Sequence, residues 1–518
     1  DQKLPKVNEQ PNKPAVARLL DTAIIVFIFL FAVSAPISIA AAQTSWLIGM
    51  SLWLARFAFY PRPKVYRTPV DYTLLGFFII SGISAFLSYE PAVSIGKLRA
   101  ASLFTVVYLI AENVTSLRIV RLLVLTVIGG CLATVLYTAG ERILGRGVKV
   151  YGVSEQSPLY KAGIRDGDTL LKVDEEKLRE PQQLVNALSK PIREPARIVI
   201  YRVEWQPTIK VPRGNLLPGA GPLEQLGISA SSRGRDWRAS GFFGHYVTYA
   251  EVLQLVIALT LGLLVTLPMK RSWAGAFLAL SLAGFVFALL LTITRAPWVG
   301  SLISSAIILT LSTRKRTVLL VAAVAIPLVF AGLFVLQQKR NIAFIDKRDH
   351  STSWRQTVWR EGTQLLISKP RHLLVGIGMD SIKGHWREWG MFDQGRIPRG
   401  HMHSNVLQIA LERGLPALLL WLAFLFVYAR TLWRTLRQIR KSIQSEVDRA
   451  NVQEKNSEHF LSKGILLGAL GGLAGFFVSG LVHYNWGDSE VAMVFYLIMG
   501  LALVVHRESL KGSQIKKL

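Results

Sequence analysis

The chain has 518 residues, 51% of them hydrophobic, and its mean hydropathy is positive, which excludes a single soluble domain. Its formal net charge of +27 would suggest nucleic acid for a soluble protein. In a membrane protein, lysines and arginines gather in cytoplasmic loops and contact anionic lipid, so we expect membrane lipid and no nucleic acid as a partner.

The apolar stretches predict a polytopic helical membrane protein. Residues 1–18 are polar and contain prolines, which favours a cytoplasmic tail over a cleavable signal. Because a spanning helix needs about 20 apolar residues, we expect twelve transmembrane helices. They lie near residues 20–42, 44–60, 70–88, 98–115, 118–140, 243–267, 273–292, 296–312, 316–336, 415–433, 461–484 and 488–506. The single cysteine, Cys131, lies inside one of them and excludes an internal disulfide.

Basic residues at the helix ends predict the orientation. With the N-terminus inside, every inner connection is basic, as the positive-inside rule requires. These connections hold Arg62, Lys64, Arg67, Arg118, Arg121, Lys270, Arg271, Arg314, Lys315, Arg316 and the 434–463 loop. Lys97, Arg99 and Arg295 then fall on the outer side, so each needs another reason. Two long polar segments, 141–242 and 337–414, also fall outside.

The first outer segment contains a small α/β pattern over residues 148–212. "AGIRDGD" predicts a helix end and a turn, "TLLKV" a strand, "DEEK" a turn, "PQQLVNAL" a helix and "ARIVIYRV" a second strand. This order resembles a bacterial PDZ domain inserted between the fifth and sixth helices. PDZ domains bind extended peptides by strand addition. "GVKVYGV" is a poor match to the loop that captures a terminal carboxylate, so a docking or spacer module is the alternative.

Three further segments carry charged or titratable residues to the outer helix ends. They are "RASGFFGHYVTYAEVLQL", which begins at Arg238, "TRAPW" around Arg295, and "RGHMHSNVLQIALERG" from 399 to 414. Each has a simpler explanation on its own. Arg238 would suit an interfacial anchor, Arg295 could reach lipid headgroups, and His401 could cap or pack a re-entrant segment.

Together these segments predict chemistry on a lipid pyrophosphate. Two guanidinium groups can hold a pyrophosphate bidentately and remain charged at any working pH. A nearby imidazole, that of His403, can accept a proton from a sugar hydroxyl. The sequence contains no Asp-x-Asp pair of the kind that carries divalent ions, and no His-Glu-x-x-His helix. We therefore expect neither a metal nor another cofactor.

The residues around His403 resemble those of the O-antigen ligases and polymerases, which are bacterial integral membrane glycosyltransferases. His403-Ser404 is followed by nine residues and Gly414, as in the family motif. Ala417 stands where the family has Gly, Tyr or Thr, a mild departure because a small residue still permits close helix packing. The segment Trp354–Ser381 is also similar, with a Trp-bearing amphipathic helix, a proline and a Gly-x-Gly turn. The resemblance covers roughly residues 230–430.

The resemblance implies an all-α, GT-C-like membrane fold and a metal-independent transferase facing the periplasm from the bacterial inner membrane. The donor would be a polyprenyl-diphosphate-linked glycan, and the acceptor lipid A-core or another glycan. His403 matches the proposed catalytic base, and Arg238 and Arg295 match the residues that engage the pyrophosphate. His401 and His245 are further substrate-binding candidates; Lys97 and Arg99 favour a surface role over phosphate binding.

Several alternatives stay open. One is a polymerase, which joins the glycan to a second lipid-linked chain, and another is a protein O-glycosylase whose acceptor is held by the PDZ-like insert. A transporter or scaffold is less favoured because the charges lie at helix ends. Residues 354–367 are spaced for an interfacial helix that covers the donor slot. The expected domains are 1–140 (helices one to five), 148–212 (PDZ-like), 230–336 (helices six to nine), 337–414 (periplasmic loop with the catalytic motif) and 415–518 (helices ten to twelve and the cytoplasmic tail).

Overall fold

A computed structural model describes residues 13–202, 206–235, 237–268, 270–312, 350–446 and 453–515. The chain is mostly helical and divides into two compact units. The first unit comprises residues 1–133, 242–290 and 294–518, and the second comprises residues 134–241 and 291–293. We describe each unit by itself and call the first the helical unit and the second the PDZ unit.

The described residues contain eight helices long and apolar enough to cross a membrane. They confirm a polytopic membrane protein. The spans are Ala15–Ser34 (α1), Pro91–Asn113 (α4 Pro91–Ala101, η1 Ser102–Phe104 and α5 Thr105–Asn113), Leu117–Leu144 (α6), Tyr246–Thr266 (α10), Trp273–Leu291 (α11), Asn405–Lys441 in α18 (Asn405–Glu446), Glu458–Ser479 in α19 (Gln453–Ser479) and Ser489–Lys511 in α20 (Ser489–Ile515).

The other four expected spans have different outcomes. Helices α2 (Ile39–Arg56) and α12 (Arg295–Ser312) form where expected but are less apolar, and α3 (Asp71–Phe86) is apolar but has only 16 residues. The expected span 316–336 lies outside the described residues. Helices and sequence stretches therefore correspond one to one wherever the structure describes them.

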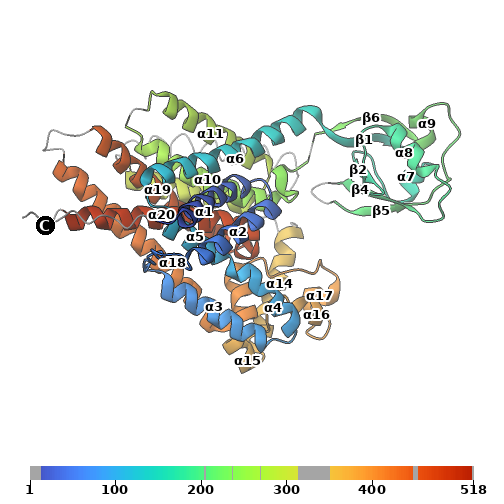
Figure 1. The fold of residues 1–518 in the computed structure, drawn as a ribbon. Helices are drawn as coiled ribbons and strands as arrows, with labels where there is room; N and C mark the ends of the chain where they lie inside the picture. Colours follow the sequence, from blue (N-terminus) through green and yellow to red (C-terminus); the bar gives the residue numbers. More distant parts are fainter. Residues whose placement is uncertain are drawn as a thin grey trace, which may run out of the picture. The chain divides into compact units, whose positions relative to one another are not determined.

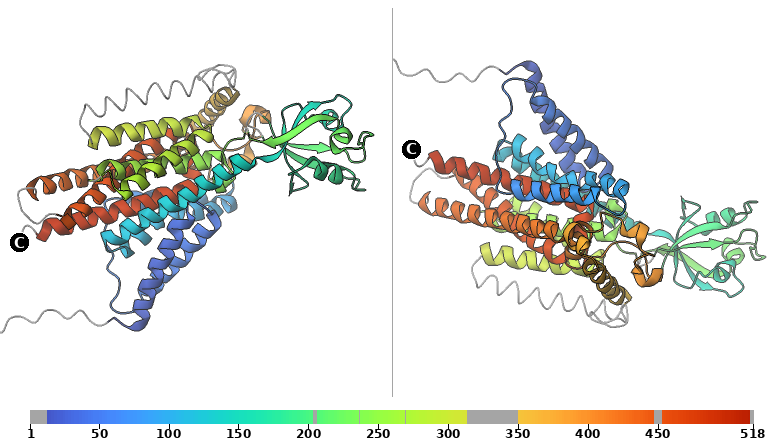
Figure 2. Two further views of the ribbon diagram at one scale, coloured as in Figure 1. Left: turned by 90° about the horizontal axis from the view of Figure 1, so that it is seen from above. Right: turned by 90° about the horizontal axis from the view of Figure 1, so that it is seen from below.

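Glycines bring the central helices of the helical unit into close contact. A Cβ on Gly262 of α10 would lie 2.4 Å from the carbonyl oxygen of Gly464 on α19. A Cβ on Gly300 of α12 would lie 2.8 Å from that of Gly475, also on α19. Small residues permit such approaches between membrane helices. Figures 1 and 2 show α10, α19 and α20 running side by side.

The connections alternate between two ends of the helical unit, as the expected topology requires. At one end, Arg507 donates to the carbonyl of Val114 at 2.5 Å, and Arg440 donates to that of Leu311. At the other, the backbone N–H of Asn405 donates to Gly480 at 2.7 Å, and Lys97 lies 2.9 Å from Asp380. We call the first the basic end and the second the polar end.

The segment before α18 folds into short helices at the polar end. They are α14 (His350–Ile367), α15 (Pro370–Val375), α16 (Ile382–His385) and α17 (Met391–Gly395). Their apolar residues form a core with the start of α18: Val358, Leu365, Leu366, Ile377, Ile382, Trp386, Met391, Phe392, Met402, Ala410 and Leu411. Figure 1 shows α16 near the start of α4, where His385 lies 3.6 Å from Glu90.

A break in α18 explains the spacing from His403 to Gly414. Gly414 has φ 81° and ψ 170°, and Pro416 has no N–H to donate to the carbonyl of Glu412. That carbonyl instead accepts from the N–H of Gly378 at 2.9 Å, and the carbonyl of Leu411 accepts from Ile377 at 2.8 Å. A Cβ on Gly414 would lie 2.4 Å from the carbonyl oxygen of Leu374, so only glycine fits. The turn Gly376-x-Gly378 and the motif glycine Gly414 therefore lie where the two segments pack against each other.

The PDZ unit is an antiparallel sheet with order β5-β4-β2-β1-β6, in which β3 pairs with β2. The strands are β1 (Arg146–Val153), β2 (Thr169–Val173), β3 (Glu176–Lys177), β4 (Ala196–Tyr201), β5 (Thr208–Val211) and β6 (Ile228–Gly234). The helices are α7 (Pro158–Lys161), α8 (Pro181–Leu188) and α9 (Pro222–Leu226). The expected strands, helix and "DEEK" turn are confirmed. Strand β6 lies beyond the expected residues 148–212 and pairs with β1 along most of its length.

Candidate functional site

The loop from 399 to 404 holds its two histidines on one side and a methionine on the other. Met402 is fully buried in the apolar core beneath α14. Its N–H donates to Gln408 Oε1 at 2.6 Å, and its carbonyl accepts from Trp359 Nε1 at 2.7 Å. His401 and His403 flank it and remain half-buried. The buried methionine therefore fixes the backbone that carries both imidazoles.

Aromatic side chains enclose the imidazole of His403. The edge of the Trp354 ring on α14 meets it at 90°, with ring centroids 4.5 Å apart. The His401 ring lies 4.0 Å away on another side, and Tyr484 lies 5.5 Å beyond His401. The expected amphipathic helix thus contributes a wall of this site. Whether it covers a donor slot stays a prediction.

The surroundings of both imidazoles disfavour their protonated forms and so lower the pKa of each ring. Burial lowers the pKa of His403 far below its usual value, and the charges of His401, Arg355, His483 and His245 lower it further. Burial, followed by the charges of His483, Lys383 and His245, lowers the pKa of His401 to about 4. The backbone N–H of His403 donates to His401 Nδ1 at 3.2 Å. A general base must be unprotonated to accept a proton, and a lowered pKa at the same time weakens its basicity.

A buried carboxylate on α10 organises the opposite side of the loop. Glu251 is 1% exposed and lies 2.9 Å from the Nδ1 of His483. Its Oε2 accepts from Asn485 at 3.0 Å, and the hydroxyl of Ser479 donates to its Oε1. A buried charge is stable only when hydrogen-bonded in this manner. Three side chains from the end of α19 and the connection to α20 therefore converge on one carboxylate.

Asn405 joins that network to the histidine loop. Its side-chain amide donates to Asn485 Oδ1 at 2.6 Å, and its Oδ1 accepts from the N–H of Trp486 at 3.1 Å. Its own backbone N–H donates to Gly480. Asn405 follows His403 by two positions, so the network around Glu251 also determines where the imidazole lies.

His245 lies at the start of α10 and shares a hydrogen-bond chain with the α19–α20 connection. Its Nδ1 is 3.2 Å from the hydroxyl of Thr248, which donates to Asp488 Oδ2 at 2.5 Å. The charge of His245 acts on both His401 and His403. The structure therefore brings together three of the five predicted site residues: His403, His401 and His245.

The two predicted arginines are placed at the connection between α11 and α12. Arg238 donates to the carbonyl of Ile293, and both residues belong to the PDZ unit. Arg295 is half-buried and is the first residue of α12 in the helical unit. Because the two units are described separately, the convergence of both arginines on His403 stays a prediction.

Sequence reasoning missed several residues of this neighbourhood. Arg355 directly follows the Trp354 that contacts His403, yet only the tryptophan carried the family pattern. Glu251 and His483 are separated by 232 positions. Nothing local in the sequence marks them as partners. A carboxylate in an otherwise apolar helix was the one available signal, because such a residue faces a polar partner or a cavity.

Within the described part of the chain, no group of three or more His, Cys, Asp or Glu side chains could hold a metal ion.

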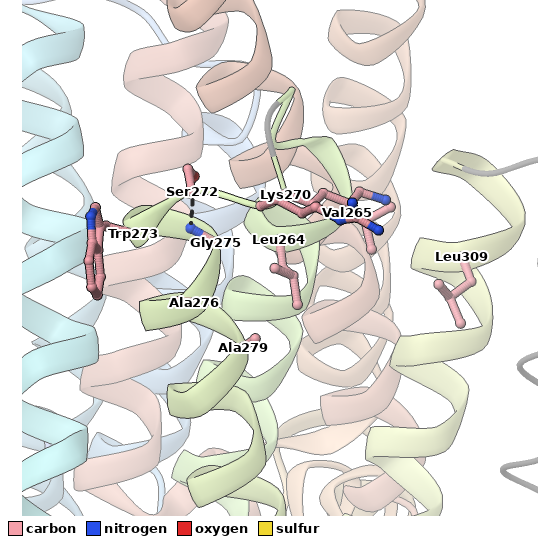
Figure 3. A pocket seen from close by; sticks show the side chains of 10 residues that line it. Leu264, Val265, Lys270, Ser272, Trp273, Gly275, Ala276, Ala279 and Leu309 are labelled. Atoms are coloured by element: carbon pink, nitrogen blue, oxygen red, sulfur yellow. Dashed lines mark hydrogen bonds between the residues drawn. The ribbon is translucent and has the colours of Figure 1, made fainter.

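A cavity of about 670 Å³ lies at the basic end, at the opposite end of the helical unit from His403. Figure 3 shows its walls on α10, α11 and α12, with Leu264, Trp273, Ala276 and Leu309 among the lining residues. None of the residues that line this cavity belongs to the histidine site.

Two family models match the chain. The O-antigen ligase family matches residues 278–422, and the PDZ domain matches residues 149–202. No curated protein matches the chain. The first match contains Arg295, His401, His403 and Gly414. Both resemblances drawn from the sequence are therefore confirmed for the matched parts of the chain: residues 278–422 are similar to the O-antigen ligase family, and residues 149–202 are similar to a PDZ domain.

Proposed function

We propose that this chain, a multi-pass membrane protein with an O-antigen ligase domain, transfers a glycan from a polyprenyl-diphosphate carrier to a sugar hydroxyl. The acceptor of a ligase of this type would be lipid A-core. The observation that carries the proposal is the environment of His403. Its imidazole is half-buried and contacts the rings of Trp354 and His401, inside the segment that matches the family.

The proposed reaction is a direct displacement. His403 accepts the proton of the acceptor hydroxyl, and the oxygen attacks the anomeric carbon of the donor sugar. The bond between that carbon and the pyrophosphate oxygen breaks, and polyprenyl diphosphate leaves with the bonding electrons. Arg238 and Arg295 would neutralise the charge that develops on the leaving group. Attack opposite to the leaving group inverts the anomeric centre.

The buried network has a clear part in this scheme. A general base must lie within hydrogen-bond reach of the proton that it accepts. Asn405 and Met402 fix the loop on both sides of His403. His401 accepts the N–H of His403 and would orient the neighbouring ring. Together they keep the imidazole in place while the donor and acceptor arrive.

The membrane orientation is part of the proposal. The basic end carries Lys270 and Arg271 between α10 and α11, and Arg507 in α20, so it would face the cytoplasm. The polar end, with the histidine loop, would then face the periplasm. A polyprenyl chain would enter sideways from the inner membrane of a bacterium, with its pyrophosphate at headgroup depth.

A transfer assay tests the proposal directly. Purified full-length protein would be given a polyprenyl-diphosphate glycan and a panel of acceptors: lipid A-core, a second lipid-linked glycan and a serine-containing peptide. We expect transfer to lipid A-core that persists in the presence of a chelator. Laddered products without core would instead indicate a polymerase. No transfer to any acceptor would contradict the proposed activity.

The PDZ unit favours one alternative acceptor. PDZ domains bind peptides by adding a strand to a sheet edge, and the sheet ends in two edge strands, β5 and β6. A bound protein could present a serine or threonine hydroxyl to the same site. A protein O-glycosylase is therefore the second candidate, and the peptide arm of the assay tests it.

A further inference from the structure

Two lysines from distant segments share one carboxylate at the polar end. Lys97 on α4 lies 2.9 Å from Asp380 Oδ2, and Lys383 on α16 lies 2.7 Å from Asp380 Oδ1. The lysine side chains are 48% and 54% exposed, whereas that of Asp380 is 22% exposed. Both ammonium groups are therefore accessible to solvent while they remain paired with Asp380.

This arrangement leaves one positive charge unbalanced. Asp380 can neutralise only one of the two ammonium groups. Glu412 accepts the backbone N–H of Asp380 at 2.9 Å, but its carboxylate also pairs with Arg413 at 3.2 Å. Glu90 and Glu388 both contact the imidazole of His385, at 3.6 and 2.8 Å. Lys97 and Lys383 instead share the single carboxylate of Asp380, so this pair of ammonium groups can attract a further anion.

The cluster of Lys97, Asp380 and Lys383 adjoins the histidine loop. The charge of Lys383 is among those that lower the pKa of His401. A second connection runs through Glu412, which accepts from the hydroxyl of Tyr484 at 3.3 Å, and the Tyr484 ring lies 5.5 Å from that of His401. An anion held by the lysines would therefore lie close to the proposed site of reaction.

Orientation singles out Lys97 together with Arg99, and of these two residues it is Lys97 that pairs with Asp380. Under the proposed topology Lys97 lies on the side where short connections contain few lysines and arginines. A basic residue in such a place usually has a functional partner. Asp380 accounts for only part of that partnership, because it is shared with Lys383.

We propose that Lys97 and Lys383 form a phosphate-binding subsite next to His401, in which Asp380 holds both lysines until the phosphate group arrives. This inference rests on the proposed function and specifies where a phosphate group of one of its substrates would bind. The phosphate could belong to the pyrophosphate of the donor or to a phosphorylated sugar of the acceptor. Asp380 then competes with the ligand, because it occupies the same ammonium groups.

That competition predicts effects of opposite sign. Removing either lysine charge weakens anion binding, whereas Asp380→Asn frees both lysines and strengthens it. A cluster that only joins α4 to α16 would behave differently, since all three substitutions would remove an ion pair of the same joint. A single charge–charge contact in a solvated site contributes about 1 kcal/mol, or about fivefold in affinity.

Binding of inorganic pyrophosphate to the full-length protein, measured by calorimetry without substrates, tests the subsite independently of transferase activity. We expect Lys97→Gln and Lys383→Gln each to weaken binding about fivefold and Asp380→Asn to strengthen it. Arg99→Gln is the matched control, because it removes a charge from an exposed residue of the same helix. Lys97→Arg keeps the charge and should retain binding if the glutamine variant fails to fold.

The transfer assay then identifies the source of the phosphate. Lys97→Gln would raise the KM for the polyprenyl-diphosphate donor if the subsite holds the pyrophosphate, and the KM for a phosphorylated acceptor if it holds that group. Weaker pyrophosphate binding in Asp380→Asn, parallel to the lysine variants, would overturn the subsite. Normal binding effects without any transfer would overturn the proposed function and leave the subsite supported.

Discussion

The chain has two long polar segments between its helices, and they are built differently. The PDZ unit has a core of its own, in which Val150, Leu170, Leu184 and Ile198 pack together within residues 148–228. Residues 350–404 have no such independence, because their core includes Ala410 and Leu411 of α18. The first segment is a domain attached to the chain. The second is completed only by the helices that it contacts.

This difference indicates where sensitivity to mutation should lie. A substitution in residues 350–404, or in the helices that hold them, acts on the proposed reaction. A change confined to the core of the PDZ unit, residues 148–228, leaves that reaction intact and affects only what is brought to it. Four experiments can break or sharpen this contrast.

The largest effect is expected for His403→Ala. Removing a general base typically costs 10²- to 10⁴-fold in rate, so we expect kcat to fall by about that amount. The variant should still insert into the membrane and keep its melting temperature, because the imidazole is half-buried and its ring takes no part in the hydrogen bonds that fix the loop. Initial rates of glycan transfer provide the measurement.

His506→Ala is the matched control for that substitution. His506 is also partly buried and contacts Thr435 at 2.7 Å, but it lies at the basic end. Its loss should leave kcat unchanged. Equal activity of His403→Ala and the unmodified protein would remove His403 from the mechanism and reopen the transporter and scaffold alternatives.

A smaller effect is expected for Glu251→Gln. The amide cannot accept from all the donors that surround it, so Asn485 and Asn405 shift and displace His403. A displacement of about 1 Å can cost up to about 10²-fold in rate. We expect kcat to fall by about tenfold or more and the KM for the donor to change little. A residue with a merely structural role would not produce this pattern of the two constants. Substrate titrations separate the two constants.

Gln254→Met tests whether any buried polar change on α10 would do the same. Gln254 lies one turn further along the helix and donates to Ser304 at 3.0 Å, away from the histidine loop. We expect a lower melting temperature from this variant and an unchanged kcat. If both variants lower kcat alike, the network does not position His403.

Particular elements show what the sequence could and could not predict. Period and composition identified the helices and the PDZ strand "TLLKV", and the family resemblance identified the motif from His403 to Gly414, because these signals are local. They placed the tenth span at 415, whereas α18 begins at Asn405. The first turns of α18 contain Asn405, Gln408 and Glu412, which bond to Asn485, Met402 and Tyr484, and such polar residues lower the apolar signal on which the prediction relied.

The missed features all depend on contacts between distant residues. Strand β6 pairs with β1 across an intervening 75 positions or so, and its sequence "ISASSRG" has no strong β pattern. Likewise, Asp380 gave no sign that it would meet Lys97. Only the tertiary fold makes such pairs visible.

A third effect concerns pH. Because burial and nearby positive charges lower the pKa of both His403 and His401, the two rings remain neutral as the pH falls through the usual histidine range. An ordinary histidine base, with a pKa near 6.5, would lose about tenfold in kcat/KM between pH 7.5 and pH 5.5. We expect less than about twofold, since kcat/KM reports the free enzyme. Arg355→Gln removes one of the positive charges and should shift the acid limb of the kcat/KM–pH profile to higher pH. A limb near 6.5 in the unmodified protein would contradict the environment assigned to His403.

The smallest effect on glycan transfer is expected from removal of the PDZ unit, and it is the most direct test of the contrast between the two segments. The excision should run from residue 145 to residue 234, because a deletion of 148–212 alone would leave β6 without its partner β1. The remaining ends are close, since Arg235 donates to the carbonyl of Ile143 at 3.2 Å, so a short Gly-Ser linker can join them. Arg142 keeps its contact with the carbonyl of Trp237 at 2.5 Å, and Arg238 remains in the chain. We expect transfer to a glycan acceptor to stay within about twofold of the intact protein, because the PDZ core lies outside residues 278–422, which match the O-antigen ligase family. If the acceptor is a protein held by the PDZ unit, its labelling should be lost while donor binding persists.

A large loss of glycan transfer in a protein that still folds would show that the inserted domain is part of the reaction site, and the contrast between the two segments would then be wrong.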